Sequence, residues 1–128
     1  MSSLNPKGIP VRIGGEEHAL LFTLNAVDDI QDRMDMPIDD VIDCLSDQRK
    51  AWKACKTILC SLLNDETERR KYYDREWEAK SYTEKEIGWM ITESDKYEVL
   101  AGILKAYGAA VPEDEDPNPE SAQQLGKS

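Results

Sequence analysis

Residues 9–27, IPVRIGGEEHALLFTLNAV, constrain the fold more than any other part of the chain. Two apolar residues, Val11 and Ile13, alternate with Pro and Arg, a Gly-Gly pair follows, and the alternation then resumes. A Gly-Gly pair supplies the positive φ angles that a tight two-residue turn needs, and strict alternation is typical of half-buried strands. This stretch therefore predicts a β-hairpin over residues 10–23.

After the hairpin, apolar residues recur at spacings of three and four, which is the period of amphipathic helices. We expect Asn25 to cap the first helix, Thr83 and Glu86 to form a capping box, and Gly108 to end the last helix. The stripes predict helices at about residues 25–34, 37–46, 48–64, 83–92 and 95–107. The predicted fold class is therefore mainly α with a small N-terminal β-hairpin.

Residues 64–82 do not fit either pattern, because they contain too few aliphatic side chains for a buried element. Tyr72, Tyr73 and Trp77 nevertheless fall at helical spacing among charged neighbours. A solvent-exposed helix and a long mobile connection both fit this segment.

The chain of 128 residues is the size of one domain. We expect a flexible leader over residues 1–8 and a single compact helical domain over residues 9–111. Residues 112–128 hold three prolines and five acids. Such a composition cannot bury enough apolar surface to offset its ordering entropy, which predicts a disordered acidic C-terminal tail.

The net charge of −10 opposes binding to phosphate backbones and anionic lipid surfaces, so we expect no nucleic-acid and no membrane partner. The charge is unevenly distributed: residues 28–47 hold eight Asp and one Arg, whereas residues 48–80 hold nine Lys or Arg and six acids. This asymmetry fits pairing of copies in a homo-oligomer, and it also fits an ordinary solvated face.

Cysteine usage favours a reducing compartment. Cys44, Cys55 and Cys60 are odd in number and form no CxxC pair, which argues against a disulfide framework and against zinc. No N-terminal signal pattern and no apolar run long enough to span a bilayer is present in the sequence.

No catalytic set is evident in the sequence. His18 is the only histidine, so every Ser-His-Asp or Cys-His arrangement would depend on it, and no GxSxG motif surrounds a serine. The Gly pair lacks the further glycines and the lysine of a phosphate-binding loop. The acids from Asp28 to Asp39 follow a helical period instead of the alternating spacing of a calcium loop. We therefore expect no enzyme activity, no cofactor and no metal.

Aromatic side chains carry the better binding signal, because Trp and Tyr are favoured at the centres of interfaces. Trp52 and Trp89 lie in apolar stripes, where core packing is the simpler explanation. Tyr73 and Trp77 are spaced i and i+4 in a highly charged stretch, which favours an interface. The candidate partner-binding residues are Tyr72, Tyr73, Trp77, Trp52 and Trp89.

The opening segment also follows a recognisable plan, in which a short hairpin with a Gly-Gly turn leads into a helix that begins with an Asn-Ala step. The residues that carry this plan are Val11, Ile13, Gly14, Gly15, Leu21, Phe22, Leu24, Ala26 and Ile30. It resembles the N-terminal part of small tail assembly chaperones and related tail proteins of long-tailed phages. With the central helix and WMITESDKYEVLAGILKAYGAAVPED, the resemblance covers about residues 9–112.

The resemblance implies a non-enzymatic protein of the host cytoplasm that binds the tape measure protein and recruits tail tube subunits. In that family a programmed frameshift often appends a second domain near the C-terminus. A structural tail subunit, such as a connector or terminator, is an alternative within the same ancestry. An acidic inhibitor that imitates DNA with residues 28–47 is an alternative of another class, and a hydrolase is the least favoured.

Overall fold

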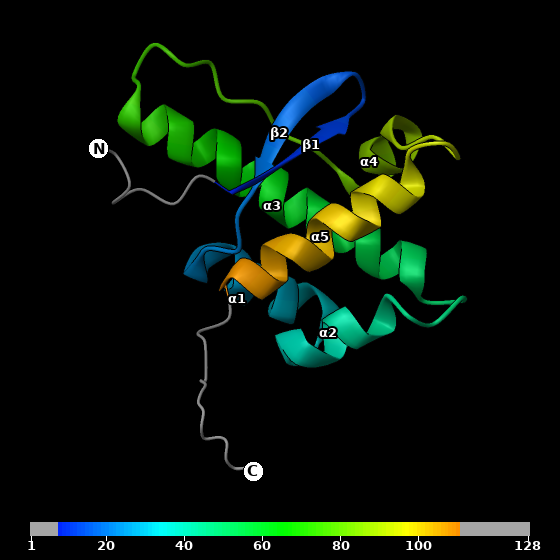
Figure 1. Ribbon diagram of the computed structural model, residues 1–128. Coiled ribbons are helices and arrows are strands. Elements are labelled where there is room, and N and C mark those ends of the chain that lie inside the picture. Colours follow the sequence, from blue (N-terminus) through cyan, green and yellow to red (C-terminus); the bar gives the residue numbers. More distant parts are fainter. Residues whose placement is uncertain (1–7, 111–128) are drawn as a thin grey trace, which may run out of the picture.

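The computed structural model describes residues 8–110 (Figure 1). It contains a β-hairpin followed by five helices: β1 (Ile9–Ile13), β2 (Glu16–Leu20), α1 (Leu24–Met34), α2 (Ile38–Cys44), α3 (Ala51–Tyr73), α4 (Glu84–Met90) and α5 (Lys96–Ala110). The predicted fold class is therefore confirmed. The predicted acidic tail, and all of the predicted leader except Gly8, lie outside the described residues.

The hairpin has the predicted Gly-Gly turn, with φ angles of 62° at Gly14 and 84° at Gly15. These values lie in the left-handed region that a two-residue hairpin turn requires. The strands end at Leu20, so the last part of the predicted hairpin, residues 21–23, is an extended connection into α1. Four side chains of the hairpin face the helices and are buried: Val11, Ile13, His18 and Leu20.

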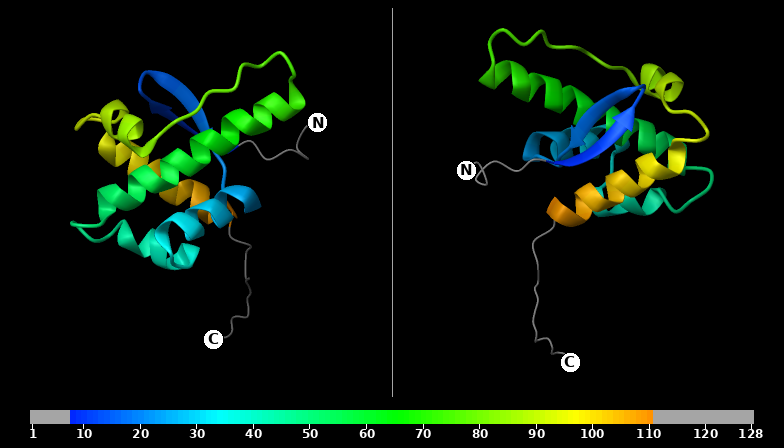
Figure 2. Two further views of the ribbon diagram at one scale, coloured as in Figure 1. Left: turned by 180° about the vertical axis from the view of Figure 1, so that it is seen from behind. Right: turned by 45° about the horizontal axis from the view of Figure 1, so that its top comes forward.

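The long helix α3 lies at the centre of the core. It contacts α1, α2, α4 and β2, while α5 lies along β1 (Figure 1). α5 passes in front of α3 in Figure 1 and behind it in the reversed view of Figure 2, so the two helices form separate layers. From Ala54 to Leu63 only Lys56 is not fully buried, which shows that α3 is covered on nearly every side.

The cap of α1 differs from the prediction. Thr23, not Asn25, is the N-cap, and its Oγ1 accepts a hydrogen bond of 3.1 Å from the Ala26 amide. The same hydroxyl donates to Asp65 of α3 at 2.8 Å. Thr23 is favoured because one hydroxyl satisfies a free helix amide and also ties the helix start to α3.

The predicted central helix over residues 48–64 is wrong at both ends, because α3 begins at Ala51 and continues to Tyr73. Of the two possibilities for residues 64–82, the first half is helix and the second half is an irregular connection. The connection is held by polar side chains of α3. Asn64 exchanges two hydrogen bonds with the backbone of Tyr82, at 2.8 and 3.0 Å, and Thr67 accepts one from the Lys80 amide at 2.9 Å.

The two C-terminal helices follow the prediction at their starts. The capping box is confirmed: Thr83 Oγ1 accepts from the Glu86 amide at 3.1 Å, and Glu86 Oε1 accepts from the Thr83 amide at 2.8 Å. Gly108 does not end α5, which continues to Ala110. Gly102 of α5 instead has a packing role, because a Cβ placed there would collide with Cγ2 of Val11 in β1.

None of the helices between residues 8 and 110 combines the length and apolar character needed to cross a bilayer.

Candidate partner-binding site

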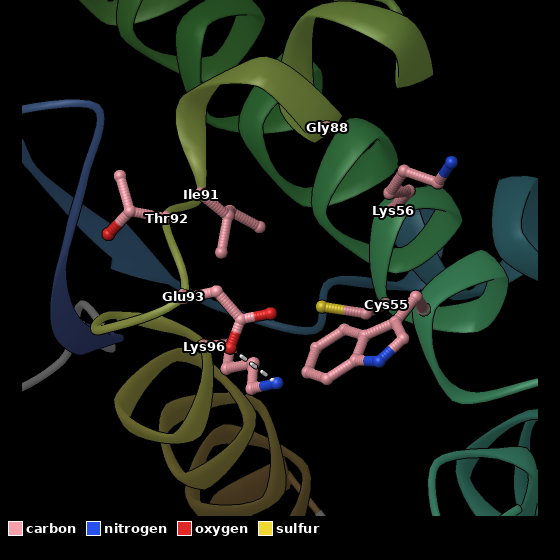
Figure 3. Close-up of a pocket in the computed structure, with 8 residues that line it drawn as sticks. Cys55, Lys56, Gly88, Ile91, Thr92, Glu93 and Lys96 are labelled. Atoms are coloured by element: carbon pink, nitrogen blue, oxygen red, sulfur yellow. Dashed lines mark ion pairs between the residues drawn. The ribbon is translucent and has the colours of Figure 1, made fainter. Parts of the chain in front are cut away.

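A surface groove runs beside the N-terminal half of α3 (Figure 3). One part, of about 290 Å³, lies between α3 and the connection from α4 to α5. A second part, of about 500 Å³, lies between the α2–α3 connection and the start of α5. Trp52 and Lys96 line both parts and join them into one surface, which we call the Trp52 groove. The apolar side chains that line it are Leu45, Ala51, Trp52, Cys55, Ile91, Tyr97 and Leu100.

Lys96 contacts one carboxylate and two aromatic rings in the Trp52 groove. Its Nζ atom lies 2.8 Å from Oε1 of Glu93, the pair joined by the dashed line in Figure 3. The same atom lies 5.5 Å from the ring centroid of Trp52 and 5.2 Å from that of Tyr97, within the range of a cation–π attraction. The hydrogen bond with Glu93 raises the pKa of Lys96 above its ordinary 10.5, which further favours the charged amine.

Lys56 supplies a second positive charge. In Figure 3 its amine points outward from α3, whereas Cys55 and Ile91 point into the space between α3 and the α4–α5 connection. No ion pair joins Lys56 to a carboxylate anywhere in residues 8–110. The groove therefore combines an apolar floor with a cation that makes no ion pair within residues 8–110.

The Cys55 thiol lines the groove without being exposed, and its burial raises its pKa from 9.0 to about 12. Because the thiolate is the reactive form, we expect Cys55 to react roughly a thousandfold more slowly with a disulfide reagent at pH 8 than in the unfolded chain. Cys60 should also be slow, because burial raises its pKa. Cys44, at the edge of the core, should react first. Peptide mapping by mass spectrometry checks this order, and fast modification of Cys55 would contradict it.

The predicted site residues do not form one cluster. Trp52 was expected to pack in the core, but it lines the groove and 36% of its surface is exposed. Trp89 was expected in the core, but this expectation is wrong, since 74% of its surface is exposed on α4. Lys56, Ile91 and Lys96 line the groove but were not among the predicted site residues. The one sequence signal for this face was the position of Lys53 and Lys56 beside Trp52.

Tyr72 and Tyr73 lie at the C-terminal end of α3. Their rings pack edge to face with centroids 4.9 Å apart, and 79% and 80% of their surfaces are exposed. Trp77 differs from them, because it folds back onto α3. Its indole N–H donates to Thr67 Oγ1 at 3.1 Å, and the guanidinium of Arg70 lies 3.7 Å above its ring. Tyr72 and Tyr73 therefore offer contact surface, whereas Trp77 holds the 74–83 connection in place.

His18 belongs to a polar cluster between β2 and α3. Its Nδ1 lies 2.9 Å from Oε1 of Glu66, and the Ala19 amide donates to the other carboxylate oxygen at 3.0 Å. His18 Nε2 is buried and has no hydrogen-bond partner in the described residues; the nearest carboxylate is Glu16, at 3.7 Å. These contacts join β2 to α3.

The stabilisation of the fold by the Glu66 carboxylate depends on pH. Burial raises the pKa, but hydrogen bonds from His18 and Ala19 and the nearby charges of His18 and Arg69 outweigh it, so the pKa lies below its ordinary 4.5. The ionised form is favoured in the folded state, and its stabilisation is complete above pH 4.5. As the pH falls from 4.5 towards the folded pKa, the unfolded chain takes up the proton first, and this stabilisation is lost.

We expect Glu66→Gln to flatten the acid limb of the stability profile. Urea unfolding at several pH values between neutrality and pH 3 measures this, with the loss of unfolding free energy below pH 4.5 being smaller in the variant than in the wild type. Identical acid limbs would contradict the role given to this carboxylate.

Within the described part of the chain, no three side chains of His, Cys, Asp or Glu gather closely enough to hold a metal ion. Comparisons of the chain with protein-family models, with curated proteins and with solved structures found no match.

Proposed function

We propose that this chain is a non-enzymatic tail assembly chaperone of a long-tailed phage or prophage. In this role it binds the tape measure protein in the host cytoplasm and recruits tail tube subunits while the tail is built. The resemblance of residues 9–112 to that family motivates the proposal. The observation that carries it further is the Trp52 groove, an apolar surface with aromatic walls on a small helical body.

The groove suits a partner that is held and later released. Helical segments commonly bind by laying an apolar face into a hydrophobic groove on another protein. Trp52 and Tyr97 provide large contact areas, and Trp and Tyr are enriched among the residues that dominate interface energies. A tape measure protein is long and rich in helices, so its apolar faces need cover before the tail tube encloses them.

Co-expression with the tape measure protein of the same phage tests the proposal. We expect the two proteins to co-purify through a tag on the tape measure protein at moderate salt, and Trp52→Ala to weaken this retention. Lys105→Glu, on the exposed surface of α5 outside the groove, is the matched control. No retention of the wild-type chain would contradict the proposal.

A structural tail subunit, such as a connector or terminator, would share the exposed aromatic residues but remain in the particle. Mass spectrometry of purified virions separates the two functions. A chaperone is absent from mature particles, whereas a connector or terminator is present at a fixed ratio to the tube protein.

The acidic surface of α1 and α2 favours a second candidate function, a DNA-mimic inhibitor. Its exposed carboxylates are Asp28, Asp32, Asp35, Asp39, Asp40, Asp43 and Asp47. This candidate requires salt-sensitive binding to a basic protein. Asp39→Asn combined with Asp40→Asn should then abolish binding, whereas the chaperone proposal expects retention of the tape measure protein by this double variant.

A further inference from the structure

We propose that the Trp52 groove selects an acidic amphipathic helix, whose apolar stripe lies against Trp52 and Ile91 while its carboxylates pair with Lys56 and Lys96. This inference rests on the proposed function, because it names the chemistry of the partner segment that such a chaperone would hold.

The charge of the groove is opposite to that of the chain. The net charge of the whole chain is −10, yet the charged side chains that line the groove are Lys56, Lys96 and Glu93. Glu93 is the single carboxylate among them, and Lys96 holds it at 2.8 Å. The part of the groove beside α2 and α5 contains Lys96 and no acid. A carboxylate of a bound partner would therefore lie near Lys56 and Lys96, and the one carboxylate that lines the groove, Glu93, is already paired.

The rim of the groove extends this positive surface. Lys53 precedes Lys56 by three positions in α3, which places the two side chains on neighbouring turns of one side of the helix. Lys53 is 3.9 Å from Glu84 and its side chain remains 69% exposed, so this long and exposed ion pair contributes little and exchanges readily. A basic helix would be repelled along this rim.

The floor of the groove suits side chains that project from a helix. Trp52 spans both parts, Ile91 and Cys55 lie in one, and Leu45, Tyr97 and Leu100 lie in the other. Gly88 lets the Lys56 side chain pack closely against α4 at the edge of the floor, since a Cβ placed there would lie 3.2 Å from Lys56 Cδ. Two depressions joined at one tryptophan fit two apolar residues on successive turns of a helix.

The acidic surface of α1 and α2 and the C-terminal residues 111–128 are alternative sources of carboxylates within the same chain. Residues 111–128 hold two apolar side chains larger than Ala, Val111 and Leu125, so they offer charge without an apolar stripe. The amphipathic partner is favoured because it alone uses both the cations and the apolar floor.

The test uses two labelled peptides of about 18 residues, a length that forms several helical turns. Both carry leucines at spacings of three and four, and they differ only in Glu or Lys on the flanking positions. Fluorescence anisotropy measures their binding to the full-length chain, to the double variant Lys56→Glu with Lys96→Glu, to Trp52→Ala, and to Lys105→Glu as the control. Circular dichroism confirms that each variant is folded.

We expect the Glu peptide to bind the wild type and the Lys105→Glu control equally and to bind the double variant about tenfold more weakly. The Lys peptide should show the reverse preference, and Trp52→Ala should weaken both peptides. Equal binding of the two peptides to the wild type would overturn the inference. So would a peptide of residues 111–128 that competes as well as the Glu peptide, or self-association that Trp52→Ala abolishes.

Different results would contradict the chaperone function and the acidic chemistry of the partner helix. If the tape measure protein is retained but the peptides show no charge preference, the partner chemistry is wrong and the chaperone function stands. If the charge preference holds but the tape measure protein is not retained, the groove chemistry stands and the chaperone function is wrong.

Discussion

Gly102→Ala is expected to lower the free energy of unfolding by about 2 kcal/mol, because the added methyl group overpacks a filled contact between α5 and β1. The Cβ would collide with Cγ2 of Val11, a buried and stiff β-branched side chain that has little freedom to move away. The gain in helix propensity, about 1 kcal/mol for Gly to Ala, only partly offsets the collision. Urea unfolding followed by circular dichroism measures the difference.

Gly108→Ala is the matched control, because Gly108 lies in the same helix and a Cβ placed there meets nothing within 4 Å. This variant should gain up to about 1 kcal/mol from helix propensity alone. In a double variant, Val11→Ala should partly rescue Gly102→Ala, so that the two effects are not additive. Equal effects at the two glycines would show that α5 does not pack on β1 as described.

Glu66→Ala is expected to cost about 3 kcal/mol of stability, since it removes two hydrogen bonds to a charged acceptor and leaves buried donors unpaired. The donors are the imidazole of His18 and the amide of Ala19, both in β2. Loss of these two hydrogen bonds should therefore loosen the hairpin first. Native-state hydrogen exchange should show a fall in protection of β2 that exceeds the fall in α1.

Glu68→Ala is the control for this prediction. Glu68 lies two residues further along α3, is exposed, and makes no ion pair within residues 8–110. Its replacement should change stability by less than about 0.5 kcal/mol. If the two Glu variants unfold at the same urea concentration, the hydrogen bonds of Glu66 contribute nothing to the stability of the fold.

The hairpin and the order of the helices were predictable because each rests on a local signal. The Gly14-Gly15 pair permits the turn, and Thr83 with Glu86 marks the start of α4 through two reciprocal hydrogen bonds. Such features depend on residues a few positions apart. Sequence reasoning can therefore identify them without knowledge of the tertiary structure.

The extent of α3 was not predictable in the same way. By residue type alone, Asn64 and Thr67 resemble surface residues. In the structure each accepts at least one hydrogen bond from the connection between Tyr73 and Thr83. The choice of Thr23 over Asn25 as a cap likewise depends on Asp65, 42 positions away in the chain. Long-range polar contacts of this kind leave no periodic pattern in the sequence.

The candidate site was predictable only by residue type. Aromatic content indicated an interface, and Trp52 does line a groove, but Trp89 lies in an apolar stripe and is exposed. α4 has 7 residues, and Ile87 is the one buried residue among them. The apolar stripe that includes Trp89 is therefore not buried as a whole. Lys56 and Lys96 are far apart in the sequence, and only the fold, in which α5 crosses α3, places them around one groove.

We propose that this molecule works by holding another polypeptide in the Trp52 groove. The decisive measurement is hydrogen-exchange mass spectrometry of the chain, free and in complex with the full-length tape measure protein. We predict that protection on binding is concentrated at the start of α3 and at residues 91–97. Protection confined to the acidic surface of α1 and α2, or no change at all, would contradict the claim.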